Sequence, residues 1–183
     1  MRELLVLAVV VVVTVVIYNG LVKLREQLQA AWADIDVQLK RRYDLIPNLV
    51  ETVKGYASHE REALEAVVRA RSSAMTAQGP AEKGHAEGML TGALKSLFAL
   101  AEAYPELKAA GGFRDLQATL ADLEDSIQNA RRYYNAVVRD FNTKVQQVPS
   151  NLVARTFGFR QAEFFEVPES ETVVPRVDFG RGA

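Results

Sequence analysis

The chain has 183 residues, of which 49% are hydrophobic, 25% charged and 8% aromatic. This composition excludes general disorder and leaves enough apolar material for one domain with a core. The net charge of −1 argues against nucleic acid as a partner, because nucleic-acid-binding domains are usually basic. The sequence has no cysteine, which excludes disulfides, thiolate nucleophiles and cysteine-based metal sites.

An uncharged apolar run near the N-terminus predicts a membrane anchor. Residues 4–22 contain nine valines and no charged side chain. As a helix they extend ~28 Å, close to the ~30 Å hydrocarbon core of a bilayer. We therefore expect residues 4–22 to contact the lipid bilayer, with Tyr18 at the headgroup level. A cleaved signal peptide is the alternative, but the run is followed by no suitable cleavage site.

The charges that flank this run predict its orientation. Arg2 stands alone on the N-terminal side, opposed by Glu3, whereas Lys23 and Arg25 follow the run and more basic residues come later. The positive-inside rule then favours a cytoplasmic C-terminal domain.

Apolar residues at spacings of three and four predict helices along most of the remaining chain. One long helix covers 21–57, two shorter helices follow, and a second long helix covers 113–148. Pro47 interrupts the first stripe, which fits either a kink in one helix or a new helix capped by Asp44. Ser58 is the expected cap of the second helix.

These elements predict an all-α fold: an N-terminal transmembrane helix (1–22) and an elongated antiparallel, up-down four-helix bundle (23–149) with two long and two short helices. The short pair covers only the membrane-distal halves of the long pair, so the membrane-proximal halves need another cover. A short helix and a Phe-rich segment at 150–167 are the candidate cover. Residues 168–183 read as a disordered tail.

Half of the eight phenylalanines lie within nine residues, at Phe157, Phe159, Phe164 and Phe165. Two interpretations fit this cluster. It fills the gap between the long helices, as the burial preference of phenylalanine favours, or it docks onto a partner or the membrane interface.

Charged residues gather before the proline of the first long helix, at Asp36, Lys40, Arg41, Arg42 and Asp44. They form either a solvated helix face or a polar ring around the bend at Pro47, which faces a partner or makes a register-setting contact inside the bundle. Together with the four phenylalanines they make up the candidate interaction surface.

Small and amide side chains mark two further helix faces. Asn135 and Asn142 lie seven residues apart beside the stripe of the last helix and are candidate register-setting residues, because buried amides fix helix register. Gly84, Gly88 and Gly92 form a stripe that predicts a frayed start to the third helix, with close packing as the alternative.

No set of residues in the sequence predicts catalysis, a cofactor or a metal. His59 begins a His-Glu pair like that of zinc proteases but lacks the second histidine four residues later. Glu82 and His85 have the spacing of a di-iron motif, but no second such pair exists. We therefore expect no enzymatic activity, no cofactor, no metal and no small-molecule substrate.

Several short motifs occur in both halves of the chain, among them Asp44-Leu45-Ile46-Pro47-Asn48-Leu49-Val50, Val53-Lys54-Gly55-Tyr56-Ala57, Tyr104-Pro105-Glu106-Leu107-Lys108-Ala109 and Ala130-Arg131-Arg132-Tyr133-Tyr134-Asn135. In these motifs the sequence resembles the LemA family of bacterial membrane proteins. The resemblance implies a short anchor in the bacterial inner membrane, an elongated antiparallel helical bundle and no assigned enzymatic activity. It also points to membrane organisation or quality control.

The expected function is an interaction or adaptor module at the inner membrane, with a protein partner or a second copy of the chain. It rests on the uncovered membrane-proximal surface of the long helices, since exposed apolar surface marks interaction sites. The alternative is a self-assembling membrane scaffold or membrane-shaping protein.

Overall fold

A computed structural model describes residues 1–167 of the chain. This part forms six helices and contains no strand. The helices are α1 (Arg2–Tyr56), α2 (Arg61–Thr76), α3 (Gly79–Ala101), α4 (Pro105–Ala109), α5 (Gly111–Gln146) and α6 (Ser150–Thr156). The predicted all-α fold with a long apolar N-terminal helix is confirmed. The tail predicted at 168–183 lies outside the described residues.

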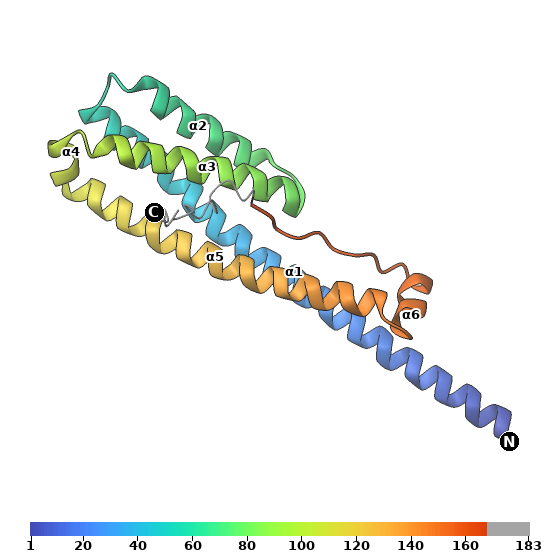
Figure 1. Cartoon of the computed structure of the whole chain (residues 1–183). Helices are drawn as coiled ribbons and strands as arrows, with labels where there is room; N and C mark the ends of the chain where they lie inside the picture. Colours follow the sequence, from blue (N-terminus) through green and yellow to red (C-terminus); the bar gives the residue numbers. More distant parts are fainter. Residues whose placement is uncertain (168–183) are drawn as a thin grey trace, which may run out of the picture.

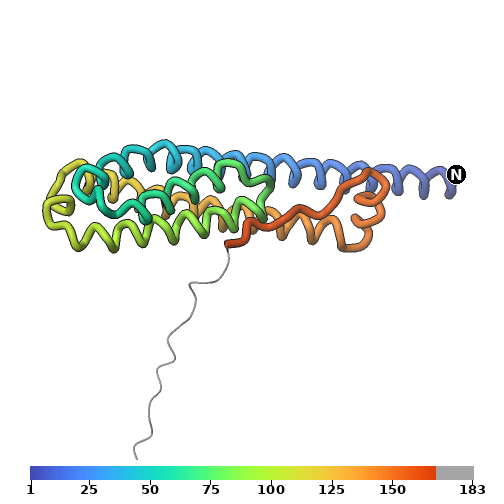
Figure 2. Tube along the Cα trace, turned by 90° about the horizontal axis from the view of Figure 1, so that it is seen from above, coloured from blue at the N-terminus to red at the C-terminus, as the bar shows by residue number. Residues whose placement is uncertain are grey.

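The two longest helices, α1 and α5, run antiparallel along each other and form the axis of an elongated molecule (Figure 1). The α2–α3 hairpin packs against the half of this pair that is distant from the N-terminus. The apolar stripe predicted for the first long helix faces inward, and Ile35, Leu39 and Ile46 are at most 1% exposed. The N-terminal end of α1 extends beyond all other elements (Figure 2).

The helix α1, with an apolar stretch at that end, is long and apolar enough to cross a membrane, judged by length and composition. Its large apolar side chains are exposed from Leu4 to Val16. Valine has a modest helix propensity in water. In lipid, a helix satisfies all backbone hydrogen bonds within the segment, so the apolar environment favours the same conformation.

Pro47 lies inside α1, which continues through it without a break. The interpretation as one helix is therefore correct, and Asp44 does not cap a new one. Proline lacks an N–H, so the carbonyl of Tyr43, four residues earlier, loses its helical donor. Arg71 of α2 replaces that donor, with Nε 2.8 Å from the Tyr43 oxygen.

The second helix begins later than the sequence predicts. Ser58 lies in the turn after α1, and Glu60 occupies the N-cap position of α2 without a side-chain capping bond. The turn is held by the N–H of Glu60, which donates to the carbonyl of Ala57 at 3.1 Å, and Ala57 itself is buried. The expected Ser58 cap is therefore wrong, because a buried residue fixes the turn before the helix starts.

The sequence analysis favoured a frayed start to the third helix, but this helix is not frayed at its glycines. It is helical from Gly79, and Gly84 packs directly against the C-terminal segment. A Cβ atom at position 84 would overlap the carbonyl oxygen of Glu166 and lie 2.8 Å from its carbonyl carbon. Close packing therefore explains Gly84, whereas Gly92 faces open space.

The bond between Arg71 and the Tyr43 carbonyl gives the first testable prediction. Arg71→Ala is expected to lower the free energy of unfolding by about 1–3 kcal/mol, the cost of a partly buried acceptor left without a donor. In a Pro47→Ala background the main-chain N–H at position 47 can serve this carbonyl, so the same Arg71 change should cost less. Denaturant unfolding of the full chain in detergent micelles, followed by circular dichroism, measures both. Equal losses in the two backgrounds would contradict the assignment.

Candidate functional site

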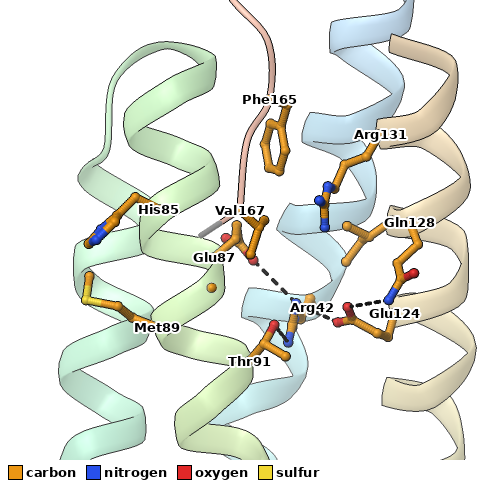
Figure 3. A pocket seen from close by; sticks show the side chains of 12 residues that line it. Arg42, His85, Glu87, Met89, Thr91, Glu124, Gln128, Arg131, Phe165 and Val167 are labelled. Carbon is orange, nitrogen blue, oxygen red and sulfur yellow. Dashed lines mark hydrogen bonds and ion pairs between the residues drawn. The ribbon is translucent and has the colours of Figure 1, made fainter. Parts of the chain in front are cut away.

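A cluster of charged side chains is buried where α1, α3 and α5 meet. Arg42 of α1 is 4% exposed and Glu87 of α3 is 3% exposed. Arg42 Nη1 lies 2.9 Å from Glu124 Oε2 of α5 and 3.4 Å from Glu87 Oε2. Arg42 Nη2 donates to Thr91 Oγ1 at 2.9 Å. One guanidinium thus connects three helices through their side chains (Figure 3).

Tyr43 and Lys83 complete the surroundings of Glu87. The Tyr43 hydroxyl donates to Glu87 Oε1. Lys83 Nζ donates to the carbonyl of Ala74 at 3.0 Å and lies 5.9 Å from the centre of the Tyr43 ring. Glu87 therefore receives a phenolic hydrogen bond on one oxygen and the Arg42 guanidinium on the other.

Burial controls how this cluster ionises. It raises the pKa of Glu87 above its ordinary value of 4.5, although the Tyr43 hydrogen bond, Arg42 and Lys83 act in the opposite direction. Burial also raises the pKa of Tyr43 far above its usual range, and the hydrogen bond to Glu87 adds to that effect. Tyr43 therefore stays a neutral donor at physiological pH.

A pocket of about 240 Å³ opens beside the cluster, and Arg131 of α5 is directed into it (Figure 3). The Arg131 guanidinium carbon lies 5.3 Å from the centre of the Phe165 ring. Among the described residues, its buried Nε has no hydrogen-bond partner. Burial lowers the pKa of Arg131, whereas Glu124 and Glu87 raise it. Three cations therefore face two carboxylates here, an arrangement suited to holding helices together.

The segment 158–167, which we call the strap, follows α6 and runs back along the molecule (Figure 2). Gly158 allows this reversal because its φ of 74° is in the left-handed region that glycine adopts easily. The N–H of Phe159 then donates to the carbonyl of Ala154 at 2.9 Å, as in a Schellman motif.

Two asparagines of α5 hold the strap by its backbone. Asn142 Nδ2 donates to the carbonyl of Ala162 at 2.9 Å, and the N–H of Ala162 donates back to Asn142 Oδ1 at 2.8 Å. Asn135 makes the same pair of bonds with Phe165, at 3.1 and 2.9 Å. Seven helical residues rise ~10.5 Å and three extended residues ~10 Å, so both pairs fit one register.

Apolar strap residues fill the groove between α1 and α5. Phe165 is 1% exposed, and its ring centre lies 6.0 Å from that of Trp32 of α1. The Tyr134 hydroxyl of α5 donates to the carbonyl of Glu163 at 2.9 Å, and burial raises the pKa of Tyr134 to about 12, with Glu163 adding to the effect. Nearer the N-terminal end, Phe159 lies against Phe141 of α5.

Three residues of the predicted interaction surface, Arg42, Phe159 and Phe165, are buried, so their assignment to an exposed contact surface is wrong. The alternatives left open, a contact inside the bundle and a filled gap between the long helices, describe them instead. Arg42 is enclosed because it pairs with two carboxylates of other helices. Phe159 and Phe165 are enclosed because they fill the groove under the strap.

The other members of that surface remain accessible. Asp36, Lys40, Arg41 and Asp44 are exposed on α1. Phe157 is 54% exposed, and Phe164 is half-buried. Whether a partner uses them stays a prediction. Asn135 and Asn142 bond the backbone of the strap rather than another helix, and their register-setting role stays a prediction.

Sequence reasoning missed the charged residues of α3, although a signal was present. Leu90, Leu94 and Leu97 form its buried stripe. The same spacing of three and four extends backwards to Glu87 and Lys83, so both charges occupy core positions. Charged residues at core positions must find partners, which indicates a buried ion pair.

The described residues offer no ready metal centre. In the range 1–167 no group of three or more His, Cys, Asp or Glu side chains is placed to hold an ion. His59 and His85 are both exposed.

The fold and the site together define, over residues 1–167, a helical protein with a candidate membrane-spanning helix and a buried cluster of charged side chains. Residues 31–179 match the LemA family, and the chain belongs to this family. The resemblance inferred from its motifs is thereby confirmed.

The similar proteins carry names of two kinds. The chain is 27% identical to the magnetosome protein MamQ of Magnetospirillum gryphiswaldense over 203 residues, which cover 95% of this chain and 75% of the relative. It is 26% identical to magnetosome protein MamQ 2 of Paramagnetospirillum magneticum, with 86% and 68% covered. It is also 27% identical to Protein LemA of Metamycoplasma hominis, with 85% and 71% covered.

Two adjacent arginines test the role of the cluster. Arg42→Ala leaves Glu87 and Glu124 without their shared cation and is expected to lower the free energy of unfolding by about 3–5 kcal/mol. Arg41→Ala, the matched control on the exposed side of the same helix, should change it by no more than about 0.5 kcal/mol. Urea unfolding of both variants in micelles measures these changes in the free energy of unfolding. Similar losses at the two positions would refute a buried role for Arg42.

The raised pKa of Glu87 predicts a pH dependence of stability. Because burial raises the pKa of Glu87 above 4.5, the folded protein binds the proton of this carboxyl group more tightly than the unfolded chain does. The Glu87 contribution to the free energy of unfolding therefore falls as the pH rises from 4.5 through the raised pKa. Glu87→Gln removes this contribution, so wild type should lose stability relative to the variant across that window. A difference that is constant with pH, measured by unfolding at a series of pH values, would contradict the shift.

Proposed function

We propose that this protein is a membrane-anchored interaction module without catalytic activity, which holds an exposed face of α1 toward a protein partner or a second copy. The continuity of α1 carries the proposal. One helix runs from Arg2 to Tyr56 and so joins the apolar end to the helical body without a hinge. From residue 23 onward it rises ~50 Å.

The body is also secured close to the anchor. Leu21 is completely buried, in a cluster with Phe141 of α5 and Val153 of α6. Since three elements meet at the C-terminal end of the apolar run, the body cannot swing freely about its anchor. A rigid mount of this kind suits a protein that presents a surface at a fixed height above the bilayer.

The presented surface is the exposed charged face of α1. Asp36, Lys40 and Asp44 follow each other at intervals of four residues, so they lie on one side of the helix. Arg41 lies beside them, and Val37 is 50% exposed. Charges of both signs around an apolar side chain favour a complementary protein surface, because mixed charges set specificity and register.

The relatives support a role at a membrane. The chain belongs to the LemA family, and two relatives are named as magnetosome proteins. Lys23 and Arg25 follow the apolar run, which favours a cytoplasmic body on the bacterial inner membrane.

Membrane shaping by a self-assembling scaffold is the second candidate function. It is favoured by exposed apolar side chains at the end of the body nearest the anchor, where Leu152 is 62% exposed. This function predicts assembly that depends on protein concentration and altered membranes on overproduction.

Mild-detergent extraction from native membranes tests the interaction module. The wild type is compared with a Lys40→Glu/Arg41→Glu variant and with a matched Arg132→Glu/Arg139→Glu variant on the exposed face of α5. We expect a distinct partner or a second copy to co-purify with the wild type and the α5 variant and to be lost from the α1 variant. Identical retention in all three would exclude this face of α1. A wild type that is monomeric and alone would refute the module.

A further inference from the structure

The uncovered apolar part of α1 is too short to span a bilayer by itself. The large apolar side chains of residues 4–16 are 45–72% exposed. These residues extend ~20 Å, against ~30 Å of hydrocarbon core. If α1 spans the membrane as proposed above, its next residues must also lie at bilayer depth.

Those next residues are covered by α6 and the residues that flank it. The Tyr18 ring centre lies 4.8 Å from that of Phe157 and 5.8 Å from that of Phe159. Leu21 is completely buried and clusters with Val153 and Ala154 of α6. Figure 1 shows α6 beside α1 at the point where α1 leaves the other helices. The position of α6 along α1 therefore coincides with the boundary of the bilayer.

The outward side of this region is apolar. Val148 is 78% exposed, Leu152 62% and Phe157 54%. Arg155 and Arg160, which are also exposed, provide positive charge next to them. Apolar side chains accompanied by basic ones are typical of elements that lie in the membrane interface.

We propose that α6, with Val148 and Phe157, inserts into the headgroup–acyl boundary of one leaflet. This is the leaflet on the same side of the membrane as the helical body. The bilayer itself is the partner of this surface. The inference rests on the proposed membrane anchoring, and continuity with the anchor supports it, because Tyr18 and Phe157 are in contact. Insertion into one leaflet expands that leaflet alone and so couples the protein to membrane shape.

Spin labelling tests the depth of α6 directly. The chain has no cysteine, so each introduced cysteine carries the only label. Leu152→Cys and Phe157→Cys replace side chains that are more than half exposed, which leaves the core intact. Val11→Cys reports on the anchor, and Arg132→Cys, exposed on α5, reports on the aqueous surface. The full chain is reconstituted in vesicles of phosphatidylethanolamine and phosphatidylglycerol, with no other protein.

The readout is accessibility of each label to oxygen, which concentrates in lipid, and to a water-soluble nickel chelate. Labels at 152 and 157 should favour oxygen, as at 11, and reverse the preference found at 132. Nickel preference at 152 and 157 with oxygen preference at 11 would overturn the α6 inference and leave the anchor intact. Protection of 152 and 157 from both reagents would also overturn it, because a second copy would then cover α6. Nickel preference at all four positions would overturn both the inference and the proposed anchoring.

Discussion

The architecture depends on how the N–H and C=O groups of the strap, an extended segment that belongs to no sheet, are hydrogen-bonded. The α2–α3 hairpin is shorter than the α1–α5 pair, so half of the groove between the long helices needs another cover (Figure 2). The strap supplies it. An extended chain carries unpaired N–H and C=O groups, whose burial is costly. Asn135 and Asn142 pair with them as a neighbouring strand would, and so allow a strand-like segment to lie on a helix.

The strap and the charged cluster support each other. Phe165 lies under the Arg131 guanidinium, and Glu166 fits against α3 because position 84 is a glycine. Buried ion pairs contribute little net stability compared with apolar packing, but a wrong register leaves their charges unpaired. We therefore interpret the Arg42–Glu87–Glu124 group as a device that fixes how α1, α3 and α5 align. Phe165 and Val167 of the strap line the pocket beside that group.

The sequence predicted the helices because apolar residues at spacings of three and four leave a clear periodic pattern. It could not decide the nature of Pro47, because the donor that serves the Tyr43 carbonyl is Arg71, 28 residues away. The sequence pattern does distinguish an exposed Arg41 from a buried Arg42. Arg42 lies three residues after Leu39 and four before Ile46, on the buried stripe, whereas the adjacent arginine is turned away by ~100°.

The contacts of the strap could not be predicted from the sequence pattern. The positions of Asn135 and Asn142 indicated a register-setting role, but an irregular extended segment has no periodicity that identifies it as their partner. The need for Gly84 likewise depends on a backbone that arrives from the other end of the chain. The sequence therefore predicted that 150–167 covers the long helices, but not which of its backbone groups contact α5 and α3.

Hydrogen exchange of the full chain in micelles tests the central claim, that two asparagines fix the strap on α5. The amides of Ala162 and Phe165 should be protected in the wild type. In an Asn135→Ala/Asn142→Ala variant that protection should disappear, and exchange should increase in the part of α1 around Trp32 that the strap covers. Unprotected strap amides in the wild type, or full protection in the double variant, would contradict the account.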